Sequence, residues 1–126
     1  MAGKIIADQI EHSTAGSLNT SYVVQGSAKA WTNFNTTPST PAIEGSFNVS
    51  SLTDNNTEVS FNLTSAMSDA FYAPTGSASG ATLTNPSNRN LAMSCISTTQ
   101  VDTEQYTTAN AQTTGYNHGS VSGDLA

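Results

Sequence analysis

Positive charge is scarce in this sequence. Lys4, Lys29 and Arg89 are its only cations among 126 residues, and the formal net charge is −6. Proteins that bind nucleic acid neutralise several phosphates with basic side chains, and binding to anionic lipid requires a basic cluster. We therefore expect no nucleic-acid partner and no electrostatic attachment to a membrane.

Long apolar runs and cysteine pairs are also lacking. The apolar run Ile5–Ala7 stops at Asp8, so the start of the chain lacks the core of a signal peptide. No stretch approaches the roughly 18 apolar residues of a membrane span. The single cysteine, Cys95, excludes an internal disulfide. The sequence predicts a protein that is made in the cytoplasm without membrane insertion.

Charged residues make up only 10% of the chain, whereas an average domain is about a quarter charged. Uncharged polar residues take their place, with 18 Ser, 19 Thr and 12 Asn. Threonine suits strands, and serine and asparagine suit turns. Leu, Glu, Lys and Arg, which favour helices, are few. This composition predicts an all-β protein of short strands and polar turns, either a small antiparallel β-sandwich or a barrel-like domain.

The clearest local unit is a predicted β-hairpin over Gly45–Thr64, because apolar residues alternate with polar ones on both sides of an Asx-rich turn. Further strands are expected at residues 22–24, 27–34, 71–73, 77–83 and 91–98, and loops at residues 35–41 and 84–90. The predicted core consists of Trp31, Phe34, Phe47, Val59, Phe61 and Leu63.

Residues 1–20 are predicted to form an N-terminal arm, followed by a single β domain over residues 21–126. Within the arm, Ile5–Glu11 fits either a short helix or a strand that pairs with a neighbouring chain. The last 28 residues are very polar, so we expect them to pack poorly alone and to contact another subunit. A thin core is often completed by association, which favours a homo-oligomer.

Two arrangements of residues could carry catalysis. His12 and Ser13, with Asp8 or Asp124, could form a hydrolase triad, but the serine lies in no nucleophile-elbow pattern. Asp102 and Glu104 would share one face of a strand, and paired carboxylates can hydrolyse glycosides when they are held about 5 to 9 Å apart. The neighbouring residues of the sequence offer no apolar environment that would raise the pKa of one of the two carboxyl groups. A solvated strand is the favoured interpretation, and no catalytic residue is predicted.

Metal ligation has two candidate sets. Asp54, Asn56 and Glu58 place oxygen ligands at alternate positions, as calcium requires, but the rest of a calcium loop is missing. His12 and His118 could meet across an oligomer axis. Cys95 is not among these sets, because it fits a small buried hydrophobe better than a nucleophile. A plain turn and surface histidines are favoured, so the sequence predicts no metal site and no cofactor.

Three stretches resemble a known family. They are the segments at residues 26–35 (GSAKAWTNFN), at 46–55 (SFNVSSLTDN) continuing at 66–73 (AMSDAFYA), and at 123–126 (GDLA). They are similar to small structural or fibre-like proteins of tailed phages, notably marine and cyanobacterial ones. Related segments have a glycine after Asp-Asn, whereas this chain has Asp54-Asn55-Asn56. Asparagine tolerates positive φ, so the turn should be kept.

The resemblance implies a non-enzymatic bacteriophage structural protein on the virion surface, either a small tail fibre or knob or a capsid decoration protein. It favours a homotrimer, and we expect the N-terminal arm to anchor the protein to capsid or tail proteins. Polar loops would then serve host attachment by contacting a surface glycan or receptor. The alternatives are a glycan-active enzyme (a depolymerase) and a free carbohydrate-binding module.

Overall fold

A computed structural model describes residues 3, 6–14, 16–56, 58–80 and 89–126, and strands dominate these residues. The all-β prediction is therefore confirmed. The strands are β1 (Gln9–His12), β2 (Gly16–Asn19), β3 (Ala28–Asn35), β4 (Ala42–Phe47), β5 (Val49–Asp54), β6 (Val59–Leu63), β7 (Ala73–Ser79), β8 (Arg89–Ser97), β9 (Gln100–Thr107) and β10 (Tyr116–Ser122). One short helix, α1 (Thr20–Gly26), precedes β3.

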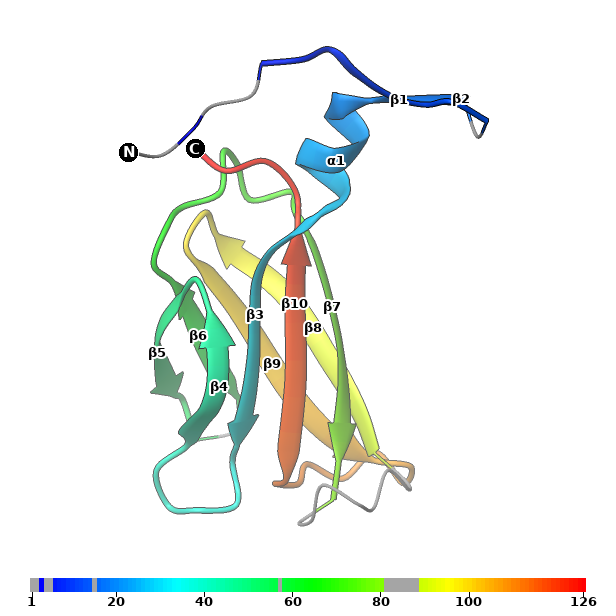
Figure 1. Ribbon diagram of the computed structural model, residues 1–126. Coiled ribbons are helices and arrows are strands. Elements are labelled where there is room, and N and C mark those ends of the chain that lie inside the picture. Colours follow the sequence, from blue (N-terminus) through cyan, green and yellow to red (C-terminus); the bar gives the residue numbers. More distant parts are fainter. Residues whose placement is uncertain (1–2, 4–5, 15, 57, 81–88) are drawn as a thin grey trace.

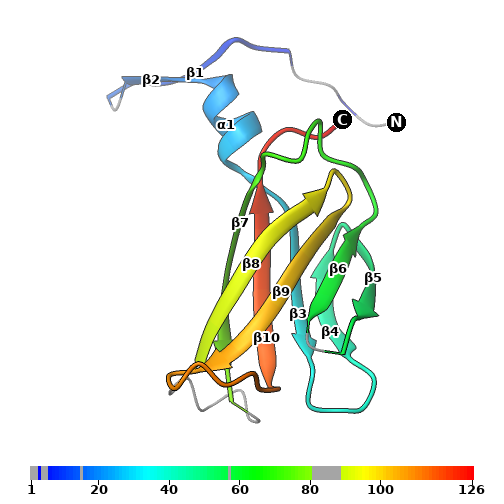
Figure 2. The same ribbon diagram turned by 180° about the vertical axis from the view of Figure 1, so that it is seen from behind.

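Eight of the described strands form two four-stranded sheets, with the orders β4-β3-β10-β7 and β5-β6-β9-β8. Every pairing is antiparallel. Figures 1 and 2 show the two sheets as separate layers, with α1 and the β1–β2 hairpin beyond one end of them. The loops after β3 and β9 lie at the opposite end (Figure 1).

Both sheets contribute to one hydrophobic core. Its buried residues are Ala30, Phe34, Phe61, Leu63, Met67, Tyr72, Val101 and Val121. The sheets approach closely at Gly119 of β10, where an added Cβ atom would lie 3.1 Å from Phe61 on β6 and 3.2 Å from Met93 on β8. Burial of this apolar surface is the main stabilising contribution that the two sheets share.

The predicted strand at residues 27–34 is observed as β3, and its alternation is correct. Ala30, Thr32 and Phe34 are buried, which places Trp31 on the outer face of the sheet. The predicted core was wrong on two aromatics, since Trp31 is 43% exposed and Phe47 is 57% exposed. These two residues are direct partners across β3 and β4.

The core prediction for Phe47 was wrong because the chain passes from one sheet to the other immediately after this residue. Asn48 adopts a left-handed φ of 56°, separates β4 from β5, and so ends the alternation that seemed to run through this point. Its side chain fixes the corner by donating to the Lys29 carbonyl (3.0 Å) and accepting from the Ser65 N–H (2.8 Å). The predicted hairpin is real, but it is β5 and β6 that form it.

The turn of this hairpin behaves as predicted. Asn56 takes up the positive φ, at 69°. The Asp54 carboxylate accepts a hydrogen bond from the Asn56 N–H at 2.9 Å, which is an Asx-type turn. Asparagine thus supplies the left-handed backbone conformation that this turn needs.

The described N-terminal residues are extended rather than helical. From Gln9 onward the chain forms β1, which pairs with β2 of the same chain, so the helix alternative over Ile5–Glu11 is wrong for its described part. The alternative of a strand that pairs with a neighbouring chain stays a prediction. The predicted strand at residues 22–24 was also wrong, because this segment lies within α1. Asn19 caps the helix by accepting from the Ser21 N–H (2.9 Å), and this local signal overrides the strand preference of valine.

The predicted strand at residues 71–73, ended by Pro74, was wrong. The strand is β7, which begins at Ala73 and contains Pro74. Proline is compatible with β7 because an edge strand has outward-facing N–H positions that make no ladder bond. Of the strand predicted at residues 77–83, the described part ends β7 at Ser79, and residues 81–83 lie outside the described residues. The loop predicted at residues 84–90 lies outside them up to residue 88, and Arg89 already begins β8.

The last 28 residues were predicted to pack poorly alone, and this was wrong; their contact with another subunit stays a prediction. β9 and β10 are inner strands of their sheets. Val101 and Val121 are fully buried in the core. Buried and half-buried positions alternate along both strands. Each strand therefore turns one side to the core although the segment is polar on average.

The four edge strands are all irregular. β7 carries Pro74, and one residue is left out of the pairing register in each of the others: Glu44 in β4, Ser50 in β5 and Ile96 in β8. Such extra residues are β-bulges, which bend and twist a strand locally.

We expect the protein to lose stability at alkaline pH. Burial raises the pKa of the Tyr72 phenol, and burial also raises the pKa of the nearby Cys95 thiol, which donates to the Tyr72 carbonyl at 3.1 Å. Both groups stay neutral in the folded protein at a pH where the unfolded chain releases their protons. Their contribution is therefore complete below about pH 8.5 and is lost as the pH rises above it.

Urea unfolding at pH 7 and pH 10 tests this expectation. The midpoint should be lower at pH 10, and Cys95→Ala should reduce the difference between the two midpoints. Equal midpoints for the parent protein at the two pH values would contradict it.

Candidate functional site

Asp102 and Glu104 share the outer face of β9, as predicted, but each is engaged in hydrogen bonds. The Ser60 hydroxyl donates to Asp102. The Tyr106 hydroxyl and the Gln112 amide both donate to Glu104. The bond to Glu104 raises the pKa of Tyr106. These hydrogen bonds fix Asp102 and Glu104 on the sheet surface, and the bond from Gln112 also links Glu104 to the loop after β9.

The acidic turn divides between two surfaces. Asp54 and Asn56 line a recess at the loop end of the molecule, whereas Glu58 lies with Asp102 and Glu104 at a shallow depression on the outer face. Within the described residues, no group of three or more His, Cys, Asp or Glu side chains could hold a metal ion. The calcium hypothesis therefore lacks a converging set of ligands.

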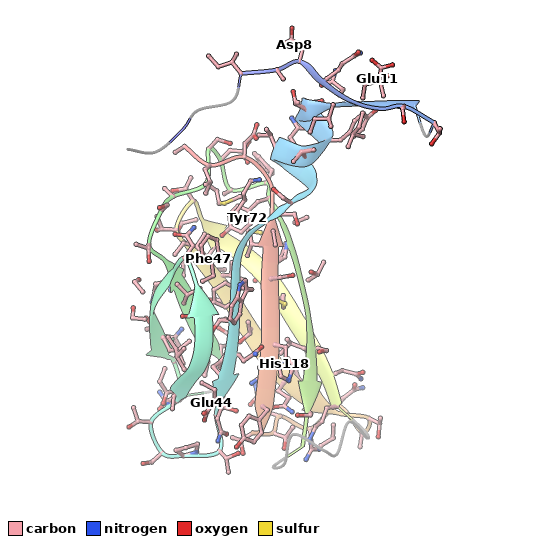
Figure 3. All side chains as sticks on the ribbon, viewed as in Figure 1. Asp8, Glu11, Glu44, Phe47, Tyr72 and His118 are labelled. Atoms are coloured by element: carbon pink, nitrogen blue, oxygen red, sulfur yellow. The ribbon has the colours of Figure 1, made fainter. Side chains whose placement is uncertain are left out.

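The two candidate histidines lie far apart in the fold. His118 is on the outer face of β10, where its Nδ1 atom lies 2.7 Å from Asn33 Oδ1 on β3. His12 is in β1, at the other end of the molecule (Figure 3 shows His118 and the N-terminal Asp8 and Glu11). Asp8 and Asp124 border one shallow depression beside α1. Cys95 packs against the core, in line with its predicted hydrophobic role.

The most developed site is one that the sequence did not indicate. It is a recess of about 350 Å³ between the two sheets at their loop end. We call it the polar recess. Its lining comes from five segments of the chain: Thr36, Pro38, Ser39, Pro41, Asp54, Asn56, Val59, Thr103, Gln105, Gln112, Thr113, Thr114 and Asn117.

Two buried amides from opposite sheets lie at the polar recess. Gln105 of β9 is 5% exposed and Asn117 of β10 is 1% exposed. The Gln105 amide nitrogen donates to the Ser79 carbonyl at 2.8 Å. Gln105 Oε1 and Asn117 Oδ1 have no hydrogen-bond partner among the described protein residues. Buried polar atoms are usually paired, so each of these acceptors calls for a donor that the described protein residues do not supply, either a water molecule or a group of a ligand.

Hydrogen bonds hold the rim of the polar recess. The Thr36 N–H and hydroxyl donate to the Gly115 carbonyl at 2.8 and 3.1 Å, and the Gly115 N–H donates to the Thr36 hydroxyl at 3.0 Å. The Thr113 N–H donates to the Gln105 carbonyl at 3.0 Å. Pro38 and Pro41 restrict the backbone of the facing loop. The recess is therefore shaped before any ligand arrives.

Apolar side chains gather at the other end of the molecule. We call this surface the apolar end; its exposed residues are Ile6, Ile10, Leu18, Tyr22, Val23, Val24, Phe71 and Leu125. No residue of α1 is buried. Ile10 and Leu18 are direct partners across β1 and β2, so they share one face of the hairpin. Exposed apolar clusters of this kind mark interaction surfaces.

Comparison with known proteins found no matching family model, no matching curated protein and no matching solved structure. In the described part of the chain, no helix is long and apolar enough to cross a membrane.

Proposed function

We propose that this chain is a non-enzymatic structural protein on the surface of a bacteriophage particle, attached at its apolar end and exposing its polar loops. The observation that carries the proposal is that the exposed apolar surface and the polar recess lie at opposite ends of the molecule. Exposed apolar side chains belong to α1 and the β1–β2 hairpin, and the polar recess is lined by the loops after β3 and β9. Figure 1 shows these elements at opposite ends of the two sheets. A protein fixed to a particle needs one face for the particle and another for the medium.

Within this proposal the fold is a β-sandwich preceded by an N-terminal arm. Core residues from both sheets and the close approach at Gly119 support two packed sheets rather than a closed barrel. The arm predicted at residues 1–20 contains β1 and β2, and α1 follows it; none of these three elements contributes a residue to the buried core. Their exposed side chains are the part of the molecule best suited to contact capsid or tail proteins.

Assembly into a homotrimer belongs to the same proposal. The Trp31–Phe47 pair on the outer face of the β4-β3-β10-β7 sheet exposes two aromatic rings side by side (Figure 3 labels Phe47). Aromatic residues are enriched at the centres of protein interfaces. Together with the apolar end, this pair offers more hydrophobic surface than a small monomer needs to expose.

A structural role is favoured over a depolymerase by the state of the carboxylates. Asp102 and Glu104 lie on an open sheet face and accept hydrogen bonds from Ser60, Tyr106 and Gln112. Glycoside hydrolysis requires two carboxyl groups that flank a substrate cleft and differ in environment. The polar recess, in contrast, has a single acidic residue, Asp54.

We expect the double substitution Ile10→Ser and Leu18→Ser to reduce incorporation into particles severely while leaving the β domain folded. Both side chains are exposed, at 54% and 45%, so their loss removes contact surface without creating a cavity. The number of copies per purified particle, measured by quantitative mass spectrometry against the major capsid protein, gives the result. Glu11→Ser is the matched control on the same strand and should incorporate normally.

The copy number of the parent protein also tests the proposal itself. Hundreds of copies per particle would identify a capsid decoration protein, and a few to some tens would identify a fibre or knob. Absence of the protein from purified particles would overturn the proposal and favour a free carbohydrate-binding module. Normal incorporation of the double variant would overturn the role of the apolar end.

A further inference from the structure

We propose that the polar recess binds an uncharged saccharide, whose hydroxyl groups donate hydrogen bonds to the side-chain oxygens of Gln105 and Asn117. The inference deepens the proposed function and rests on it only in assigning the recess to the outward end of the protein. It names the chemical class that this end recognises.

The orientation of the Gln105 amide is fixed by its surroundings. A carbonyl can only accept, so the group that faces the Ser79 carbonyl at 2.8 Å must be the amide nitrogen. The amide oxygen is therefore presented as an acceptor, and it has no partner among the described residues. Asn117 Oδ1, from the opposite sheet, also has no hydrogen-bond partner among the described residues. A ligand that satisfies both must carry at least two donors, as neighbouring sugar hydroxyls do.

The charge of the recess selects against anions. Its lining contains the carboxylate of Asp54 and no lysine or arginine, and the whole chain carries a net charge of −6. A phosphate or a uronic acid would find no cation there and would be repelled by Asp54. An uncharged polyol meets no such penalty.

A metal ion is also disfavoured at this position. Hard cations such as calcium require six to eight oxygen ligands, with several carboxylates among them in tight sites. Asp54 is the single carboxylate, and one of its oxygens already accepts from the Asn56 N–H at 2.9 Å. Organic donors therefore fit the site better than a metal ion.

The walls also match a sugar ring, which has apolar C–H faces and a polar hydroxyl edge. Pro38, Pro41 and Val59 supply apolar surface, and Thr103 and Thr113 add hydroxyl-bearing side chains. The volume of about 350 Å³ lies at the lower end of the usual range for ligand sites, roughly 300–1,000 Å³. It therefore admits a short segment of a glycan chain rather than a long one.

The test uses the purified full chain on an array that pairs uncharged oligosaccharides with acidic ones of the same backbone. The best uncharged oligosaccharide is then titrated by calorimetry, and calcium chloride alone is titrated separately. We expect binding of uncharged glycans and weaker binding of their acidic counterparts. Gln105→Met should weaken binding at least about tenfold because a shape-matched apolar group replaces the acceptor.

Two further variants keep the test decisive. Gln25→Met on α1 makes the same chemical change at an exposed site outside the recess, and it should bind as the parent does. Ser39→Trp on the exposed loop blocks the recess without touching the core, so it tests the site even where Gln105→Met fails to fold. It should abolish binding.

Three results would overturn the inference: no uncharged glycan bound by the parent protein, binding that survives both Gln105→Met and Ser39→Trp, or calcium binding in place of sugar binding. None of them depends on whether the protein is found in particles. The copy number per particle in turn does not depend on sugar binding, so the two proposals can fail separately.

Discussion

Replacing Phe61 by alanine should lower the free energy of unfolding by about 3 to 5 kcal/mol. Phe61 on β6 is fully buried, and its ring fills the space between the sheets, where it lies opposite Gly119 on β10. Glycine has no side chain that could move into the space left by the ring. The cavity should therefore stay largely open, which places the cost in the upper part of the range for such substitutions. A domain of this size is stable by about 5 to 15 kcal/mol, so the loss is a large fraction of the total.

Phe71→Ala is the matched control, because it removes the same ring from a site that is 94% exposed. It should change the free energy of unfolding by no more than about 0.5 kcal/mol. Urea unfolding followed by tryptophan fluorescence of Trp31 measures both variants. Similar losses for the two substitutions would mean that the core does not lie where the structure places it.

The second large effect is expected for Gly76→Ala on β7. An added Cβ atom there would lie 2.5 Å from the His118 carbonyl oxygen, 2.5 Å from the Met93 sulfur and 2.9 Å from a Leu91 methyl carbon. Met93 and Leu91 are flexible side chains of β8, but the carbonyl belongs to the backbone of β10 and can move only with its strand. We expect a loss of about 1 to 3 kcal/mol from overpacking.

Gly45→Ala on β4 provides the comparison for this effect. A Cβ atom at Gly45 would meet the Trp31 ring at 3.6 Å, an ordinary contact distance, so the substitution should be close to neutral. Thermal unfolding of both variants by circular dichroism gives the measurement. An unchanged melting temperature for Gly76→Ala would show that β7 and β8 pack more loosely than described.

The sequence predicted the fold best where local patterning and the tertiary structure agree. The alternation around Phe34 and the Asx turn at Asn56 are local properties, and both predictions hold. The prediction that Phe47 lies in the core was wrong because Asn48, with its positive φ, leads the chain into the other sheet, and alternation alone does not reveal this change. The strand predicted at Tyr22–Val24 was wrong because the cap residue Asn19 favours a helix there.

The polar recess could not have been predicted from the sequence. Its residues come from the loop after β3, the β5–β6 turn, β6, β9 and the segment from Gln112 to Asn117, which only the pairing of strands brings together. Its two key amides looked like ordinary polar positions in a polar segment. One signal was available: Gln105 and Asn117 fall in phase with buried Val101 and Val121 on their strands, so alternation would have placed both amides inward.

The irregular edge strands bear on how densely the protein can be packed without forming fibrils. An uninterrupted edge offers unpaired N–H and C=O groups to a second molecule and can seed edge-to-edge aggregation. Here each edge of the two sheets is interrupted, by Pro74 in β7 and by the bulged residues Glu44, Ser50 and Ile96 in the other three. Copies held side by side at high local concentration would thus be prevented from pairing their edge strands through backbone hydrogen bonds. Contacts between them would be made by side chains.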